Sequence, residues 1–118
     1  TCYKNYLTNL NVTNNTKLNS LDCTDNKLTS LDVTQNTKLS WLGCEKNQLT
    51  TINVSKNTML NQLYVSNNFL TAIDVVNNPE LTIFYCYSNQ ITSVDISKNP
   101  KIKYFSKPFL APDLFMLH

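Results

Sequence analysis

The chain has 118 residues, which is the size of one domain, and its formal net charge is only +2. Because it contains no run of basic residues and no interleaving of arginine with aromatic residues, we expect no nucleic acid partner. No apolar stretch approaches the ~20 residues of a membrane-spanning helix, so we expect no membrane span, and we expect no signal peptide within these residues.

The sequence repeats with a period of 21 residues. Its clearest copy, Leu39 to Leu49, reads L-x-x-L-x-C-x-x-N-x-L, and related strings run through 18–28, 60–70 and 81–91. This string is the strand and turn of a leucine-rich repeat. We therefore predict an α/β-type leucine-rich-repeat solenoid, a right-handed coil of about five repeats with mostly parallel β structure and little or no helix.

The predicted solenoid covers residues 1–105, and residues 106–118 form a C-terminal tail. The solenoid starts in mid-repeat without an N-terminal cap, so we read the chain as part of a longer protein. We expect its uncapped first coil to be capable of end-to-end self-association. The tail is too apolar for a solvated linker and is predicted to cover the last coil through Phe109, Leu110, Leu114, Phe115 and Leu117.

Each coil has two halves of different character. In the first half, for example 28–36, the outward positions are uniform Asp or Asn and Thr or Ser, which is typical of a solvated outer wall. In the second half the outward positions vary and include aromatic residues, so we assign this half to the concave parallel sheet. The column of Asp32, Asp74 and Asp95 is interrupted by Asn11 and Asn53, and we predict solvated wall there and no metal site.

Two columns of asparagine recur once per coil. An asparagine amide both donates and accepts hydrogen bonds, so it can satisfy backbone groups that face inward where the chain turns. We predict structural roles for Asn5, Asn26, Asn47, Asn68 and Asn89, and for Asn15, Asn36, Asn57, Asn78 and Asn99.

The cysteines form a further column, made of Cys2, Cys23, Cys44 and Cys86, with Val65 in the remaining coil. Parallel strands ~4.8 Å apart hold Cβ atoms farther apart than the ~3.8 Å of a disulfide. A straight column also does not converge on a metal as tetrahedral ligands must. We therefore predict free, buried and unreactive thiols that act as small apolar groups, and no metal or cofactor.

Aromatic residues gather on four neighbouring strands of the predicted sheet. The candidate ligand-binding residues are Trp41, Tyr64, Ile83, Tyr85, Tyr87 and Tyr104. The only glycine, Gly43, is predicted to leave a notch between Trp41 and Tyr64. Exposed aromatic clusters mark recognition surfaces, although stacking between strands would also explain them. Asp22, Asp25, Glu45 and Lys46 are expected to form a polar rim.

From Cys2 to Tyr104 the repeat resembles the cysteine-bearing leucine-rich repeats of the internalin family of bacterial surface proteins. The residues that carry the resemblance are Cys23, Cys44, Cys86, Asn26, Asn47 and Asn89. Val65, Lys107 and Leu110 depart from the pattern. The resemblance implies a secreted or wall-anchored, extracellular adhesin whose concave face engages a host or surface partner.

Three classes of function follow from these observations. The favoured one is a non-enzymatic, adhesin-like module that binds a host or surface protein. The alternatives are a carbohydrate-binding module, since flat aromatic rings suit sugars, and a structural spacer without a ligand. We predict no enzymatic activity, because the sole histidine is the last residue and no serine or cysteine has a neighbouring base.

Overall fold

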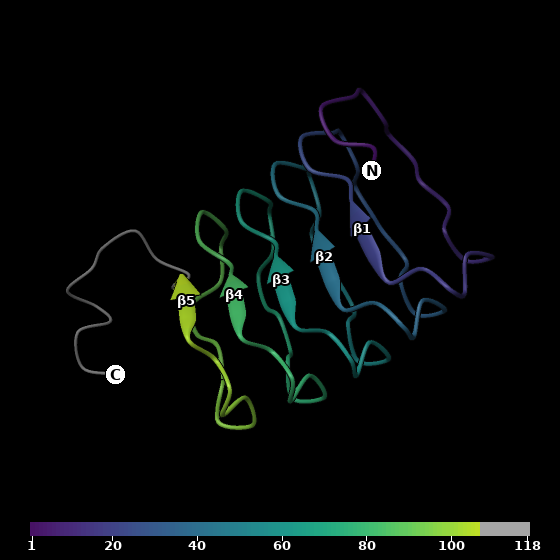
Figure 1. The fold of residues 1–118 in the computed structure, drawn as a ribbon. Helices are drawn as coiled ribbons and strands as arrows, with labels where there is room; N and C mark the ends of the chain where they lie inside the picture. Colours follow the sequence, from purple (N-terminus) through teal and green to yellow (C-terminus); the bar gives the residue numbers. More distant parts are fainter. Residues whose placement is uncertain (107–118) are drawn as a thin grey trace.

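In the computed structural model, residues 1–106 are described, and they form a stack of coils that contribute one short strand each (Figure 1). The strands are β1 (Ser20–Asp22), β2 (Trp41–Gly43), β3 (Gln62–Tyr64), β4 (Ile83–Tyr85) and β5 (Tyr104–Ser106). They pair in parallel in the order β1-β2-β3-β4-β5. The predicted solenoid and its sheet-forming half are confirmed, and no helix occurs within residues 1–106.

The register of the sheet is one repeat per strand. Leu21 pairs with Leu42, Leu42 with Leu63, and Phe84 with Phe105. Ser106 still belongs to β5, so the sheet extends one residue beyond the predicted boundary at 105. At the other end, the backbone N–H of Cys2 donates to Asp22 at 2.8 Å, although β1 is the first regular strand.

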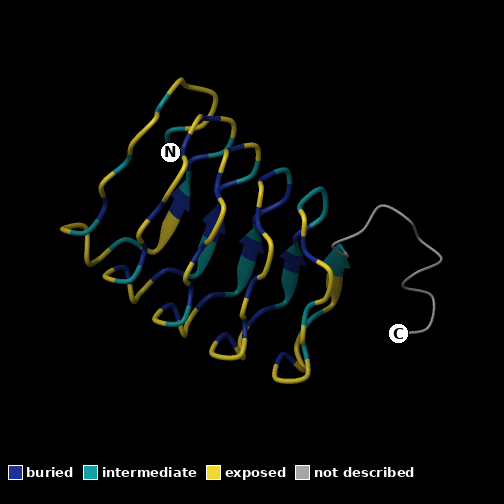
Figure 2. Ribbon diagram, turned by 180° about the vertical axis from the view of Figure 1, so that it is seen from behind, coloured by how far each residue is buried: buried dark blue, intermediate teal, exposed yellow. Residues whose placement is uncertain are grey.

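The core lies between the sheet and the outer half of each coil. Figure 2 shows buried residues on the inside of successive coils and exposed residues on their turns and outer segments. The side chains of Leu28, Leu49 and Leu70 are fully buried, as are those of Leu42 and Leu63. Each coil therefore buries its apolar residues against its two neighbours, as expected of a repeat protein.

The turn that leaves the sheet contains a left-handed residue in each coil. Lys4, Asp25, Lys46, Asn67 and Ser88 have φ angles between 53° and 62°. The left-handed region is sterically unfavourable for residues with a Cβ atom. The asparagine that follows holds the turn, since Asn47 Nδ2 lies 3.0 Å from the carbonyl oxygens of Cys23 and Cys44, to which it donates.

The structural role predicted for the asparagines is confirmed except at Asn15, whose side chain makes no hydrogen bond among the described residues, and the two columns differ. In the column at the sheet, Oδ1 of Asn47 also accepts from the N–H of Leu28, and Asn26, Asn68 and Asn89 make the equivalent bonds. In the other column, Asn36, Asn57, Asn78 and Asn99 donate to backbone carbonyls of the preceding coil, but their buried Oδ1 atoms have no partner among the described residues. Asn15 contributes its backbone carbonyl, which accepts from Asn36.

The four thiols are free, as predicted. The Cys23 thiol points to the next strand, with Sγ 3.6 Å from the carbonyl oxygen of Gly43, and Cys44 is placed in the same way against Tyr64. Burial raises the pKa of Cys23 and of Cys86 to about 12, and it also raises the pKa of Cys44 well above the usual value of a thiol. Since the thiolate is the reactive form, these sulfurs are chemically quiet.

The predicted covering tail lies outside the described residues, except for Ser106. Within residues 1–106, no helix is long and apolar enough to cross a membrane.

Candidate functional site

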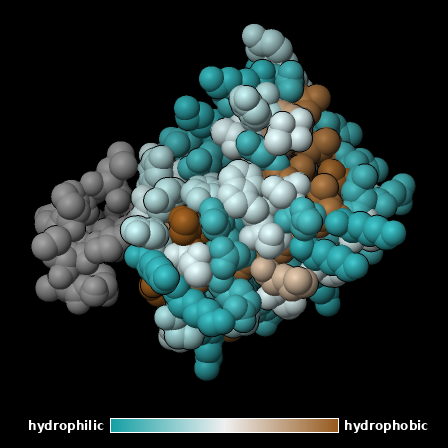
Figure 3. All heavy atoms as spheres, in the orientation of Figure 1, coloured by the Kyte–Doolittle hydropathy of each residue, from teal (hydrophilic) through white to brown (hydrophobic). Residues whose placement is uncertain are grey.

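We define the sheet face as the outward side chains of β1 to β5 and of the residues that directly follow each strand. In β2, β3 and β4 the middle residue is buried and the first residue is partly exposed. Figure 3 shows the surface over the middle of the sheet as mainly of intermediate hydropathy, with hydrophilic side chains around much of it and a hydrophobic area toward the N-terminal coil. This is the surface on which the sequence places its candidate binding residues.

Three of the six candidate residues form a continuous aromatic row. The ring centroids of Trp41 and Tyr64 are 5.3 Å apart, and those of Tyr64 and Tyr85 are 5.2 Å apart. Both distances lie in the range of favourable aromatic contacts. The Tyr64 hydroxyl also donates to Gln62 Oε1 at 2.7 Å, which fixes the central ring. We call Trp41, Tyr64 and Tyr85 the aromatic row.

The other three candidates are less closely connected. Ile83 and Tyr104 are register partners on β4 and β5, and Tyr104 is 60% exposed. Tyr87 follows β4 by two residues and is partly exposed. None of the three takes part in a ring contact among the described residues. The structure thus brings together the middle of the predicted patch, whereas its remaining members lie beside it.

The predicted notch at Gly43 is absent. A Cβ added to Gly43 would lie 2.6 Å from Cη2 of Trp41 and 2.7 Å from its Cζ3, so the indole ring already occupies the space that the glycine leaves. Gly43 is consequently buried. The prediction was wrong because the missing side chain is replaced by an aromatic ring from the same strand, and an empty space is not retained.

The polar rim predicted at this end of the sheet contains two carboxylates close to the row. Asp22 pairs with Gly43 in the register, and its Oδ1 accepts from the N–H of Thr24 at 3.1 Å. Glu45 is about half-buried, and burial raises the pKa of its carboxyl; the nearby Ser66 hydroxyl and Lys46 ammonium partly offset this shift. Nothing in the sequence indicates that Glu45 is desolvated or that Ser66 is buried.

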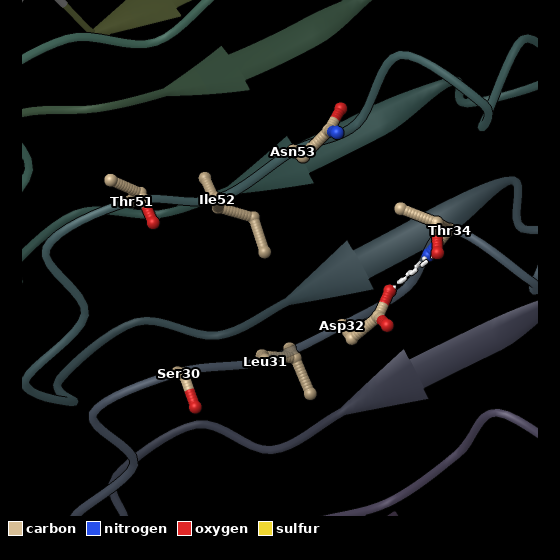
Figure 4. A pocket seen from close by; sticks show the side chains of 7 residues that line it. All are labelled: Ser30, Leu31, Asp32, Thr34, Thr51, Ile52 and Asn53. Atoms are coloured by element: carbon tan, nitrogen blue, oxygen red, sulfur yellow. Dashed lines mark hydrogen bonds between the residues drawn. The ribbon is translucent and has the colours of Figure 1, made fainter.

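The outer wall presents grooves between neighbouring coils. Figure 4 shows one such groove, which is lined by Ser30, Leu31, Asp32, Thr34, Thr51, Ile52 and Asn53. Leu31 and Ile52 are buried. The polar groups are bonded to their own turns, since Asp32 Oδ1 accepts from both the N–H and the hydroxyl of Thr34.

The same local bond recurs along the outer wall at Asn11, Asn53, Asp74 and Asp95. Aspartate and asparagine side chains commonly bond the N–H two residues further on. This bond within each turn explains why aspartate or asparagine recurs at this position of the outer wall. Within residues 1–106, no cluster of His, Cys, Asp or Glu side chains is arranged to hold a metal ion.

Solved structures of known proteins share this architecture. The functional domain of InlJ from Listeria monocytogenes, which includes a cysteine ladder, is 31% identical, with a TM-score of 0.58 over 92% of the chain and 34% of that structure. The internalin InlF from the same organism is 25% identical, with a TM-score of 0.66 over 89% of the chain and 39% of that structure. A leucine-rich-repeat protein from Leptospira interrogans is 21% identical, with a TM-score of 0.84 over 89% of the chain and 29% of that structure, and supports the fold.

The chain therefore spans between 29% and 39% of the length of these three structures. No family model and no curated protein sequence matches it. The 21-residue repeat, the parallel sheet and the column of free thiols agree with the likeness to the internalins. The chain is a bacterial internalin-like leucine-rich-repeat protein.

Proposed function

We propose that the chain is a non-enzymatic, adhesin-like module of a bacterial surface or secreted protein, and that it binds a protein through the sheet face. The observation that carries this proposal is the aromatic row, in which three large rings contact one another while remaining partly exposed. Large aromatic side chains held on a rigid surface are typical anchors of protein interfaces. The likeness to the internalins supports the same class of function.

The rigidity of the row favours recognition. The rings pack against each other, and the Tyr64 hydroxyl is bonded to Gln62. Because such side chains lose little further freedom on binding, the entropic cost of association is reduced. The backbone beneath the row is held by the ladder of buried asparagines.

The ring geometry argues against the carbohydrate alternative. Trp41 and Tyr64 are inclined by 40°, and Tyr64 and Tyr85 by 84°, so the row does not offer a flat platform for sugar rings. In addition, the space above Gly43 is filled by Trp41. An uneven aromatic surface is better suited to the side chains of a protein.

The proposal is tested by measuring the binding of the purified chain to cultured epithelial cells that are intact, treated with protease or treated with glycosidases. We expect the bound amount to fall after protease treatment. In the variant Tyr85→Ser/Tyr87→Ser, apparent affinity should fall about tenfold or more, because truncation of an interface anchor commonly costs at least one such factor.

A matched control is provided by two exposed aromatic residues outside the strands. Tyr6 is 84% exposed and Phe69 is 50% exposed. The variant Tyr6→Ser/Phe69→Ser should bind as the unaltered chain does. Equal binding of all three chains would favour a spacer, and loss of binding after glycosidase treatment alone would favour the carbohydrate alternative.

A further inference from the structure

Two carboxylates lie at one end of the aromatic row. Asp22 is the last residue of β1 and pairs with Gly43, which in turn pairs with Tyr64. The position of a Cβ on Gly43 would be 3.4 Å from Asp22 Oδ1 and within 2.7 Å of the Trp41 ring. The Asp22 carboxylate and the indole therefore meet above the same glycine.

Glu45 places the second carboxylate on the same face. It follows Gly43 by two residues, so side-chain alternation directs both positions outward. Glu45 is close enough to Asp22 that the negative charge of Asp22 contributes to the raised pKa of Glu45. The ion pair found within residues 1–106 joins Lys101 to Glu80, so neither of the two acids has a paired cation in this part of the chain.

A buried hydroxyl completes this region. Ser66 occupies the repeat position after Glu45 and is fully buried. Its hydroxyl interacts with the Glu45 carboxyl and lowers the pKa of that group, and its Oγ has no other hydrogen-bond partner among the described residues. Because Ser66 is fully buried, it is not itself open to a ligand at the surface.

We propose that Asp22 and Glu45 receive a cationic side chain, arginine or lysine, from the protein that binds the sheet face, with the cation lying against Trp41 and Tyr64. This inference rests on the proposed function and specifies the chemistry of the partner.

Charge and ring chemistry support the assignment. A partner that covered the two carboxylates with apolar or acidic groups would desolvate them without compensation, which is unfavourable. An arginine or lysine would instead pair with the carboxylates and contact the faces of aromatic rings, an interaction that is strongest with tryptophan. Electrostatic complementarity of this kind determines which partner is accepted.

The test uses a short synthetic peptide rich in arginine, and the same peptide with citrulline in place of arginine, which has a similar shape without the charge. Trp41 is the only tryptophan, so its fluorescence reports binding at this place. The full chain is compared with Asp22→Asn/Glu45→Gln and with the control Asp74→Asn/Asp95→Asn, which removes equal charge from the outer wall.

We expect the arginine peptide to change Trp41 fluorescence. The citrulline peptide should bind at least about tenfold more weakly. Asp22→Asn/Glu45→Gln should weaken binding of the arginine peptide about tenfold, whereas Asp74→Asn/Asp95→Asn should have no effect. On the unaltered chain, added salt should weaken the arginine peptide selectively, a measurement that does not depend on how a variant folds.

Equal binding of both peptides, or an equal effect of the two double variants, would overturn the proposal. The cell-binding assay separates this outcome from failure of the proposed function. If the peptides bound equally while Tyr85→Ser/Tyr87→Ser still lost cell binding, the cationic partner would be wrong and the binding face would stand.

Discussion

The sheet face and the outer wall have the same repeat and the same one-coil register, but they use their side chains differently. On the outer wall, Asp32 and Asp95 bond the N–H groups of Thr34 and Ser97 in their own turns. On the sheet face, Trp41, Tyr64 and Tyr85 contact across strands and remain partly exposed. The backbone therefore does not account for the difference between the two surfaces.

This contrast separates two kinds of position in a repeat protein, those that recur in every coil and those that vary. A residue that recurs in every coil satisfies a need that recurs in every coil, such as a bond within a turn. The sheet-face residues change from strand to strand, from Asp22 to Gly43 to Tyr64, so no single structural requirement of the coil explains them. The residues at such positions can therefore be selected for contact with a binding partner.

The two faces are separated by a core that should be closed to water, and the thiols test this. Because burial raises the pKa of Cys23 and of Cys86 from 9.0 to about 12, their thiolate fraction near pH 8 should be about a thousandfold lower than that of a free thiol. We expect an aromatic disulfide reagent to modify only the partly exposed Cys2 rapidly in the folded chain.

The same reagent should modify all four thiols after denaturation. Rapid modification of Cys44 in the folded chain would show that the core is open, and the comparison of two separate faces would no longer hold.

The two asparagine columns should contribute unequally to the free energy of unfolding. Asn47, at the sheet, uses both amide atoms, whereas Asn57, at the far side of the coil, leaves a buried Oδ1 without a partner among the described residues. Replacing Asn47 with alanine should lower the free energy of unfolding by about 3 kcal/mol or more, because several buried backbone groups lose their partner.

Asn57→Ala should cost less, about 1–2 kcal/mol, since it also removes an unpartnered acceptor. Urea unfolding followed by circular dichroism measures both variants. A larger loss for Asn57→Ala than for Asn47→Ala would contradict the unequal roles of the two columns.

A smaller effect concerns the acids on the two faces. The raised pKa of Glu45 means that the folded chain ionises this carboxyl less readily than the unfolded chain, so Glu45 lowers stability as pH rises above the usual glutamate range. Glu45→Gln should therefore increase stability at neutral pH, by no more than about 0.5 kcal/mol because solvent screens a half-exposed group. The gain should disappear in acid.

Asp95→Asn is the matched substitution on the outer wall. Hydrogen bonds from Ser97 lower the pKa of Asp95, so this carboxylate supports folding above the usual aspartate range and loses that contribution as pH falls. The variant should be less stable at neutral pH, with the difference fading in acid. Thermal unfolding between pH 3 and pH 7 measures both variants, and equal signs would contradict the assignment.

The sequence was sufficient to predict the register, the sheet-forming half, the free thiols and the structural asparagines. These features follow from the period, because residues one repeat apart must become neighbours on adjacent coils. The period does not determine how an exposed side chain turns. For this reason Trp41 was placed in the correct row, while its position over Gly43 was missed.

The burial of polar groups on the sheet face also could not be predicted from the sequence. Ser66 and Glu45 occupy outward positions by alternation, yet Ser66 is fully buried and Glu45 is partly desolvated. Such burial depends on the volumes of side chains on neighbouring strands. The role of the candidate residues in binding remains a prediction.

The most direct measurement is hydroxyl-radical footprinting of the chain, both free and bound to the cells of the cell-binding assay. If the sheet face makes the contact, oxidation of Trp41, Tyr64 and Tyr85 should fall on binding, while Tyr6, which is 84% exposed, should react as before. Protection of Tyr6 with unchanged oxidation of the aromatic row would contradict the account.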